Sequence, residues 1–258
     1  MTEAEWLACT DPRKMLQFLH DPDGAGGRAH LLAPFLRRSS TVTSYGLSGE
    51  RKERLLAVAC CRLALASYPD QRLEGVLRMA EEYADGRATA AELREARPEA
   101  DRVHIDLVLK AYEREPGSFE MQMRVASAVS IAAEEAGFAD ESVSRVVSAL
   151  SDSPFRPYKE YARREANAKS RVAHLLRCIF GNPFHRPAID PAVLKWHDGT
   201  VGRMAQGIYG DHAFARLSIL ADALLDAGCD DGALIAHCRS NGPHVRGCWA
   251  VDLILGKE

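Results

Sequence analysis

Residues 50–67 carry the sequence ERKERLLAVACCRLALAS, and beyond Arg54 its apolar side chains cover most of a helix circumference. A helix that is apolar on nearly every side lies buried in a protein core. Cys60 and Cys61 are neighbours here, and adjacent helical residues diverge by about 100°, so both thiols are expected to fill core space. The sequence leaves open a wider cluster in which this helix meets Cys178 or the C-terminal histidines. The stretch therefore predicts a buried helix.

Helix signals continue on both sides of this stretch. Thr89 and Glu92 have the spacing of a capping box, which predicts a short helix that ends at Pro98, because the residue before a proline disfavours helical backbone. The other helices are predicted from capping residues at their starts, glycines just after their ends and apolar residues that recur with the helical period. Their expected ranges are 2–8, 12–20, 50–67, 70–85, 99–114, 118–136, 139–150, a long polar helix that ends at Gly181, 201–209, 212–227, 231–239 and 244–255.

The pattern predicts an all-α fold, because no segment shows convincing strand alternation. We expect a multi-helix globular domain of packed antiparallel helices with no significant sheet. Residues 1–181 form a long-helix region with an irregular insertion at about 21–50, which mixes turn residues with one short apolar patch. Residues 182–258 form a C-terminal short-helix region, expected to pack on the first region as one globule.

Composition narrows the functional classes. The chain has 258 residues, of which 47% are hydrophobic and 27% charged, so it is long and apolar enough to build a hydrophobic core without stabilising cross-links. A net charge of −3 argues against a general binder of nucleic acid or anionic membranes. No apolar run approaches the roughly 18 residues of a membrane span, and the acidic N-terminal stretch lacks the apolar core of a secretion signal. Seven cysteines predict reduced thiols and a cytoplasmic protein.

The C-terminal stretch 237–258, HCRSNGPHVRGCWAVDLILGKE, concentrates histidine and cysteine. With Cys229 included, the intervals between Cys229, Cys238, His244 and Cys248 match those of CCCH zinc fingers, with the histidine and the last cysteine exchanged. Three thiolates and one imidazole form a normal tetrahedral zinc shell. The competing interpretation, which the helical character of 231–238 favours, is that these thiols are only buried.

A catalytic interpretation of the same stretch is weaker. His244, Cys248 and Asp252 would share one stripe of a final helix, but Asp252 lies on the far side of the cysteine and cannot orient the histidine. Because this helix is apolar on most sides, Arg246 and Asp252 are expected to join a structural polar network with neighbouring helices. No nucleotide-binding, nucleophile-elbow or zinc-protease motif occurs, so we assign no catalytic residue and favour a non-enzymatic protein.

Basic residues gather on the long polar helix. They form a candidate stripe for phosphate or an acidic partner, although long solvated helices often look the same. The stripe consists of Arg156, Lys159, Arg163, Arg164, Lys169 and Arg171, with Arg177 beyond it.

Several longer stretches resemble a group of proteins from planctomycete bacteria. These are MTEAEWLACTDPRKMLQFL at the start, LLAVACCRLAL, LLRCIFGNPF, WHDGTVGRMAQGIYGDHAFARLSILADALLDAGCDD, and HCRSNGPHVRGCWAVDLILGKE at the end. Relative to shorter members of the group, residues 22–50 look like an insertion. No activity is known for the group, so the resemblance implies a bacterial cytoplasmic protein and no site residue.

These observations support three functional hypotheses. The leading one is a non-enzymatic helical interaction or regulatory module, without a cofactor, whose partner is another protein. The first alternative is a zinc-binding protein that uses the C-terminal Cys/His cluster. The second is a nucleic-acid-associated accessory protein that uses the basic stripe of residues 156–171. None of the three involves a membrane.

Overall fold

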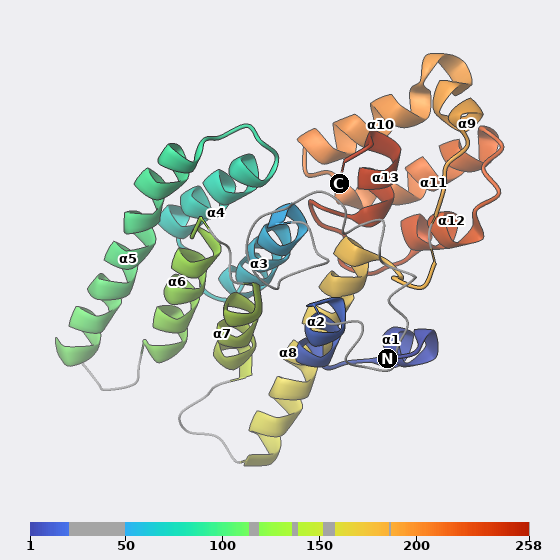
Figure 1. The fold of residues 1–258 in the computed structure, drawn as a ribbon. Helices are drawn as coiled ribbons and strands as arrows, with labels where there is room; N and C mark the ends of the chain where they lie inside the picture. The colour runs from blue at the N-terminus through green and yellow to red at the C-terminus, as the bar shows by residue number, and fades with distance from the viewer. Residues whose placement is uncertain (21–49, 114–118, 136–138, 152–157, 186, 258) are drawn as a thin grey trace. The chain divides into compact units, whose positions relative to one another are not determined.

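The computed structural model describes residues 1–20, 50–113, 119–135, 139–151, 158–185 and 187–257. All regular structure in these residues is helical, which confirms the predicted all-α fold of packed helices without a sheet (Figure 1). The predicted insertion at 21–50 lies almost wholly outside the described residues, as does Arg156. No helix of the described part of the chain is long and apolar enough to cross a membrane.

The helices follow one another with short connections where the structure describes them. They are α1 (Glu3–Ala8), α2 (Pro12–His20), α3 (Glu50–Leu65), α4 (Gln71–Ala84), α5 (Ala90–Glu113), α6 (Glu120–Ala132), α7 (Ala139–Ser151), α8 (Tyr158–Phe180), α9 (Pro191–Lys195), α10 (Thr200–Gly210), α11 (Leu217–Asp226), α12 (Gly232–Arg239) and α13 (Trp249–Leu255), with 3-10 helices η1 (Trp196–Asp198) and η2 (Phe214–Arg216).

Packing divides the chain into two compact units. The first consists of Met1 and residues 8–173, and the second of residues 2–7 and 174–258. Helix α8 supplies its longer N-terminal part to the first unit and its last two turns to the second. The division thus falls inside α8, whereas the sequence placed a boundary after Gly181. That the two regions form one globule stays a prediction.

Helix α3 lies at the centre of the first unit and contacts α4, α6 and α7, as the prediction of a buried helix requires. Its one buried cation, Arg54, donates to the carbonyl oxygens of Ala132, Glu134 and Glu135. Ala132 is the last residue of α6, and Glu134 and Glu135 follow it, so the guanidinium binds carbonyls at the negative end of this helix. Arg54 therefore joins α3 to the end of α6, and the same guanidinium stacks on the ring of Tyr83.

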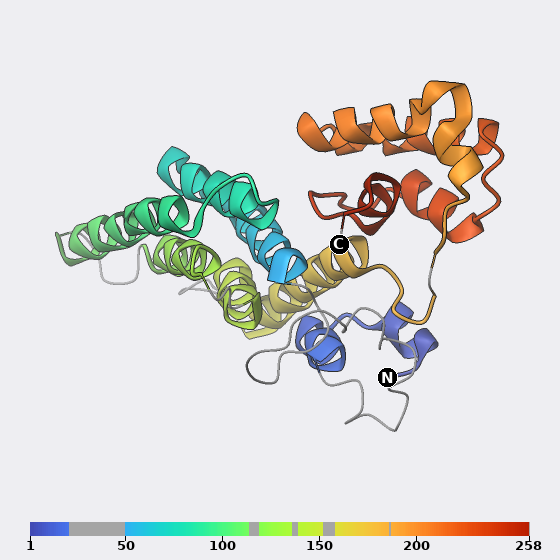
Figure 2. The same ribbon diagram turned by 45° about the horizontal axis from the view of Figure 1, so that its top comes forward.

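The predicted helix break at Pro98 is wrong, because α5 runs through Pro98 without interruption. A proline inside a helix removes one hydrogen bond and costs about 3 kcal/mol. Leu93 on one side of Pro98 and Ala100 and Val103 on the other are fully buried, and α5 packs against α4 and α6. Figures 1 and 2 both show α5 lying beside α6. Burial on both sides of Pro98 thus outweighs the local preference.

The second unit closes around the end of α8. The fully buried Trp6 of α1 donates its indole N–H to the carbonyl of Gly181 at 3.1 Å, and Arg177 donates to the carbonyl of Trp6. Gly181 follows α8 with a φ of +68°, the left-handed conformation that glycine adopts most easily. A Cβ at this position would lie 3.1 Å from Cγ of Trp249. Gly181 is therefore required by both its backbone and its neighbour.

Gly181→Ala is expected to destabilise the second unit by about 2–4 kcal/mol, because left-handed backbone costs alanine about 1–2 kcal/mol and crowding of Trp249 adds a similar amount. Gly228→Ala is the matched control in the same unit: Gly228 has a φ of +83°, but a Cβ added there would meet no atom within 4 Å. Urea unfolding followed by tryptophan fluorescence measures the difference. Equal losses of stability in both variants would contradict the importance of the Trp249 contact.

Candidate metal centre

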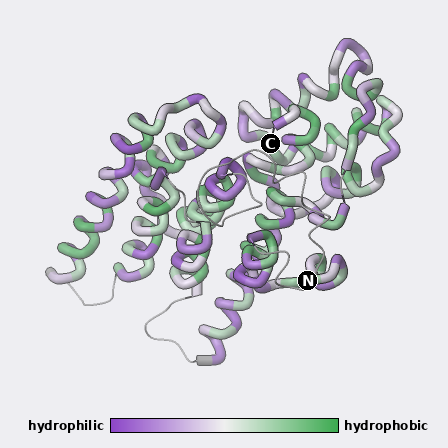
Figure 3. The backbone as a smooth tube through the Cα atoms, in the orientation of Figure 1, coloured by the Kyte–Doolittle hydropathy of each residue, from purple (hydrophilic) through white to green (hydrophobic). Residues whose placement is uncertain are grey.

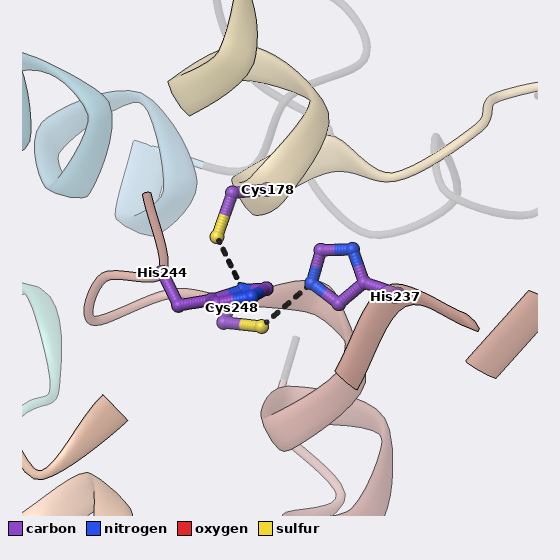
Figure 4. Close-up of side chains that lie close together, drawn as sticks. All are labelled: Cys178, His237, His244 and Cys248. Atoms are coloured by element: carbon purple, nitrogen blue, oxygen red, sulfur yellow. Dashed lines mark hydrogen bonds between the residues drawn. The ribbon is translucent and has the colours of Figure 1, made fainter. Parts of the chain in front are cut away.

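Four side chains of the second unit converge at one point: Cys178, His237, His244 and Cys248 (Figure 4). Their potential ligand atoms all lie within 4.8 Å of one another. Cys178 comes from the last turn of α8 and His237 from α12, whereas Cys248 directly precedes α13. His244 lies between α12 and α13. We call these four residues the Cys/His group.

Local caps and turns place the C-terminal members of the group. The carboxylate of Asp231 accepts from two backbone N–H groups at the start of α12, and α12 ends at Arg239. Gly247, with a φ of +87°, then turns the chain immediately before Cys248. The carbonyl of Cys248 accepts the backbone N–H of Asp252, so Cys248 is the N-cap of α13. The turn between α12 and α13 therefore returns His244 and Cys248 to the side of His237.

The separations within the group are close to those of a tetrahedral zinc shell. His237 Nε2 lies 3.1 Å from Cys248 Sγ, and His244 Nδ1 lies 3.9 Å from Cys178 Sγ. Zinc–sulfur bonds of about 2.3 Å and zinc–nitrogen bonds of about 2.0–2.1 Å place tetrahedral donors roughly 3.3–3.8 Å apart. Small side-chain movements are therefore sufficient to let the four donors bind one ion.

A second layer of contacts orients the two imidazoles. His244 donates from Nε2 to the carbonyl of Ser240 at 3.1 Å, which leaves Nδ1 as the acceptor atom that faces Cys178. Histidines that bind metals usually donate their other ring nitrogen to such an oxygen. The hydroxyl of Ser240 donates in turn to the carbonyl of His237. The ring of His237 packs on Trp249 with 5.0 Å between centroids. Both imidazoles are thus held in position independently of any ion.

Hydrogen bonding in the group favours an ionised sulfur. Burial acts to raise the pKa of Cys248, but hydrogen bonds with the Cys178 thiol and the two imidazoles lower this pKa well below its usual value. The hydrogen bond to Cys248, together with burial, raises the pKa of Cys178 well above its usual value. Thiolate is the form of cysteine that binds metals. These contacts favour the thiolate form of Cys248, and the Cys178 thiol would lose its proton when an ion binds.

Burial distinguishes the sulfurs from the imidazoles. Cys178 is 3% exposed and Cys248 is 0% exposed, whereas His237 and His244 are partly exposed. Burial also acts to lower the pKa of His244, but hydrogen bonds to Cys248 and to the Ser240 carbonyl raise this pKa above its usual value. The group thus has an apolar sulfur side and an imidazole side that solvent reaches.

Only two residues of the sequence-derived zinc set, His244 and Cys248, belong to the group. Cys229 and Cys238 are buried in the apolar core of the second unit instead. Burial and then the nearby Cys248 and Cys229 raise the pKa of Cys238 to about 12, which disfavours its thiolate. The helix predicted at 244–255 begins only at Trp249, so His244 and Cys248 do not share a helix face. A turn, rather than helical spacing, brings them together.

The remaining predicted residues lie elsewhere. Arg246 and Asp252 are both buried, and Arg246 stacks on the ring of Tyr209 and lies 3.4 Å from His212 Nε2. Asp252 is close enough to Cys178 to raise the pKa of that thiol, as a minor contribution. Cys60 and Cys61 lie in α3, within the first unit and outside the Cys/His group.

The described part of the basic stripe lies along α8, where hydrophilic residues recur (Figure 3). Lys169 pairs with Glu165 at 2.8 Å, and Arg164 lies 3.5 Å from Glu160. Lys159, Arg163 and Arg171 are exposed. Two of the five described cations of the stripe are therefore engaged with acidic neighbours on their own helix, which is typical of a solvated helix surface.

No protein-family model, curated protein or solved structure matches the chain.

Proposed function

We propose that the second unit is a zinc-binding module and that Cys178, His237, His244 and Cys248 are the zinc ligands. The observation that carries this proposal is the convergence of four nitrogen and sulfur donors within 4.8 Å, two of them buried thiols.

The donor chemistry selects zinc among the common metals. Two thiolates and two imidazoles are soft or intermediate donors and favour a tetrahedral ion, whereas magnesium and calcium prefer oxygen donors. Two thiolates neutralise the charge of a divalent cation, which suits a site with a buried sulfur side. Zinc is also redox-inert, so the site would persist without electron-transfer partners.

The zinc has a structural role in this proposal. Four protein donors complete a tetrahedron and leave no position for a substrate or a catalytic water. The ligands come from α8, from α12 and from the segment before α13, which lie far apart in sequence. One ion therefore cross-links the end of α8 to the last two helices. In this proposal the protein is a non-enzymatic module for interaction with another protein, with zinc as its fold-stabilising ion.

The direct test is the metal content of untagged protein purified without chelator, measured by mass spectrometry. We expect about one zinc per chain. Replacement of zinc by cobalt(II) is expected to produce the intense visible absorption and the sulfur-to-metal charge transfer of tetrahedral cobalt with thiolate ligands. Purified protein that contains no zinc and gives only the weak spectrum of hydrated cobalt would overturn the proposal.

A further inference from the structure

The two sulfur atoms of the Cys/His group are close neighbours although their residues are distant in sequence. Cys178 Sγ and Cys248 Sγ lie within 4.8 Å of each other, and the two thiols share a hydrogen bond. Cys178 is in the last turn of α8 and Cys248 lies between Gly247 and α13. Both positions are next to a segment end, where small adjustments of backbone are least costly.

We propose that Cys178 and Cys248 form a disulfide when hydrogen peroxide, or another small hydroperoxide, oxidises the site, and that the metal is released in the same event. This inference rests on the proposed zinc function, and it adds a covalent modification that regulates the site. The Cys/His group would then exist in two forms, one held by a metal and one held by a sulfur–sulfur bond.

Hydrogen peroxide is the only oxidant that formation of this disulfide requires. One thiolate attacks a peroxide oxygen, the O–O bond breaks, and a sulfenic acid and a hydroxide result. The second thiolate then attacks the sulfenic sulfur, the S–O bond breaks, and a second hydroxide leaves as the disulfide forms. The two sulfurs lose two electrons in total, the peroxide gains them, and two protons from solvent convert both hydroxides to water. Two neutral imidazoles remain, which are too few donors to retain the ion tightly.

The geometry favours this pair over the other thiols of the described chain. A disulfide requires the sulfurs to approach to about 2.05 Å, a short movement from their present separation. Cys60 and Cys61 lie at adjacent helical positions in the other unit, and their side chains diverge. Cys238 is a competitor, because Cys248 lies close enough to contribute to the raised pKa of Cys238, but Cys238 is not a member of the Cys/His group.

The sulfur side and the imidazole side of the Cys/His group bear on which oxidant reaches the sulfurs and on what oxidation changes in the structure. The sulfurs are nearly fully buried and the two imidazoles are partly exposed, so we expect a water-sized peroxide to oxidise the site more readily than a bulky disulfide reagent. After oxidation, the disulfide still joins α8 to the start of α13. His237 and His244, however, lose their shared ion, so the turn between α12 and α13 loses its metal anchor. Oxidation is thus expected to loosen that turn without unfolding the unit.

The test treats reduced full-length protein, as purified, with one equivalent of hydrogen peroxide. A chromogenic chelator follows zinc release, and peptide mapping after alkylation identifies the linked cysteines. We expect release of one zinc for each Cys178–Cys248 link. Cys229→Ser, which alters a buried thiol outside the group, is expected to behave as wild type, and Cys178→Ser is expected to form no link at Cys248.

Two outcomes would overturn the inference: oxidation of Cys248 to sulfinic acid without a link, or a link between Cys238 and Cys248 as the main product. Either result would leave the zinc proposal intact if the metal content is stoichiometric. Conversely, protein without zinc that still forms the Cys178–Cys248 link would refute the proposed function while supporting the modification site.

Discussion

Chelation of zinc is expected to lower the melting temperature of the second unit by about 15–30 °C. A ligand present at 1,000 times its dissociation constant stabilises the folded state by about 4 kcal/mol. In a unit of this size, about 1 kcal/mol shifts the melting temperature by roughly 4–8 °C. The effect is limited to the second unit because all four ligands belong to it. The first unit has its own core around α3 and lacks the group.

The chain provides a selective probe for this experiment. All three of its tryptophans, Trp6, Trp196 and Trp249, belong to the second unit. Tryptophan fluorescence therefore follows unfolding of the second unit, whereas circular dichroism follows all helices. We expect a strong chelator to shift the fluorescence transition and to leave a component of the circular dichroism transition unchanged. Restored zinc should reverse the shift, and superimposable fluorescence transitions with and without bound metal would contradict a structural role for zinc.

The fold was largely predictable from local patterns. The all-α class followed from caps and periodicity, and the burial of α3 followed from the apolar circumference of residues 55–65. Two predicted helix ends were wrong, the end at Pro98 and the start of the last helix at residue 244, and both errors have a common physical origin. Tertiary burial carries α5 through Pro98, and the left-handed Gly247 delays the start of α13 to Trp249. Local propensity cannot weigh either effect, because both depend on what the segment packs against.

The candidate site was predictable only in part. The density of histidine and cysteine after His237 indicated metal chemistry, and it included two true members of the group, His244 and Cys248. Interval matching then selected Cys229 and Cys238, which lie near in sequence. Cys178 could not be found by spacing, because it reaches the group through the packing of α8 on the last helices. The only sequence signal for His237 was its place in the same dense stretch.

The two ligand sets make opposite predictions for matched variants. Cys178→Ala is expected to reduce zinc from about one per chain to near zero and to lower the stability of the second unit slightly below that of chelated wild-type protein, because packing is lost as well. Cys238→Ala removes an equally buried thiol from the same unit, but it is expected to retain zinc. Both variants lose a similar amount of packing, which costs about 1–2 kcal/mol for so small a side chain. Any difference between them therefore reports on metal binding.

Zinc content and tryptophan fluorescence, measured with and without chelator, distinguish the two ligand sets. In Cys238→Ala, chelation should still shift the fluorescence transition, since all four ligands are present. In Cys178→Ala, chelation should have no further effect, because three ligands no longer hold the ion tightly. The reverse result, in which Cys238→Ala loses zinc and Cys178→Ala keeps it, would restore the set of Cys229, Cys238, His244 and Cys248. Such a result would require the Cys238 side chain to leave the apolar core around it, whereas the Cys178 sulfur already lies with the other three donors, so the structure favours Cys178 as the ligand.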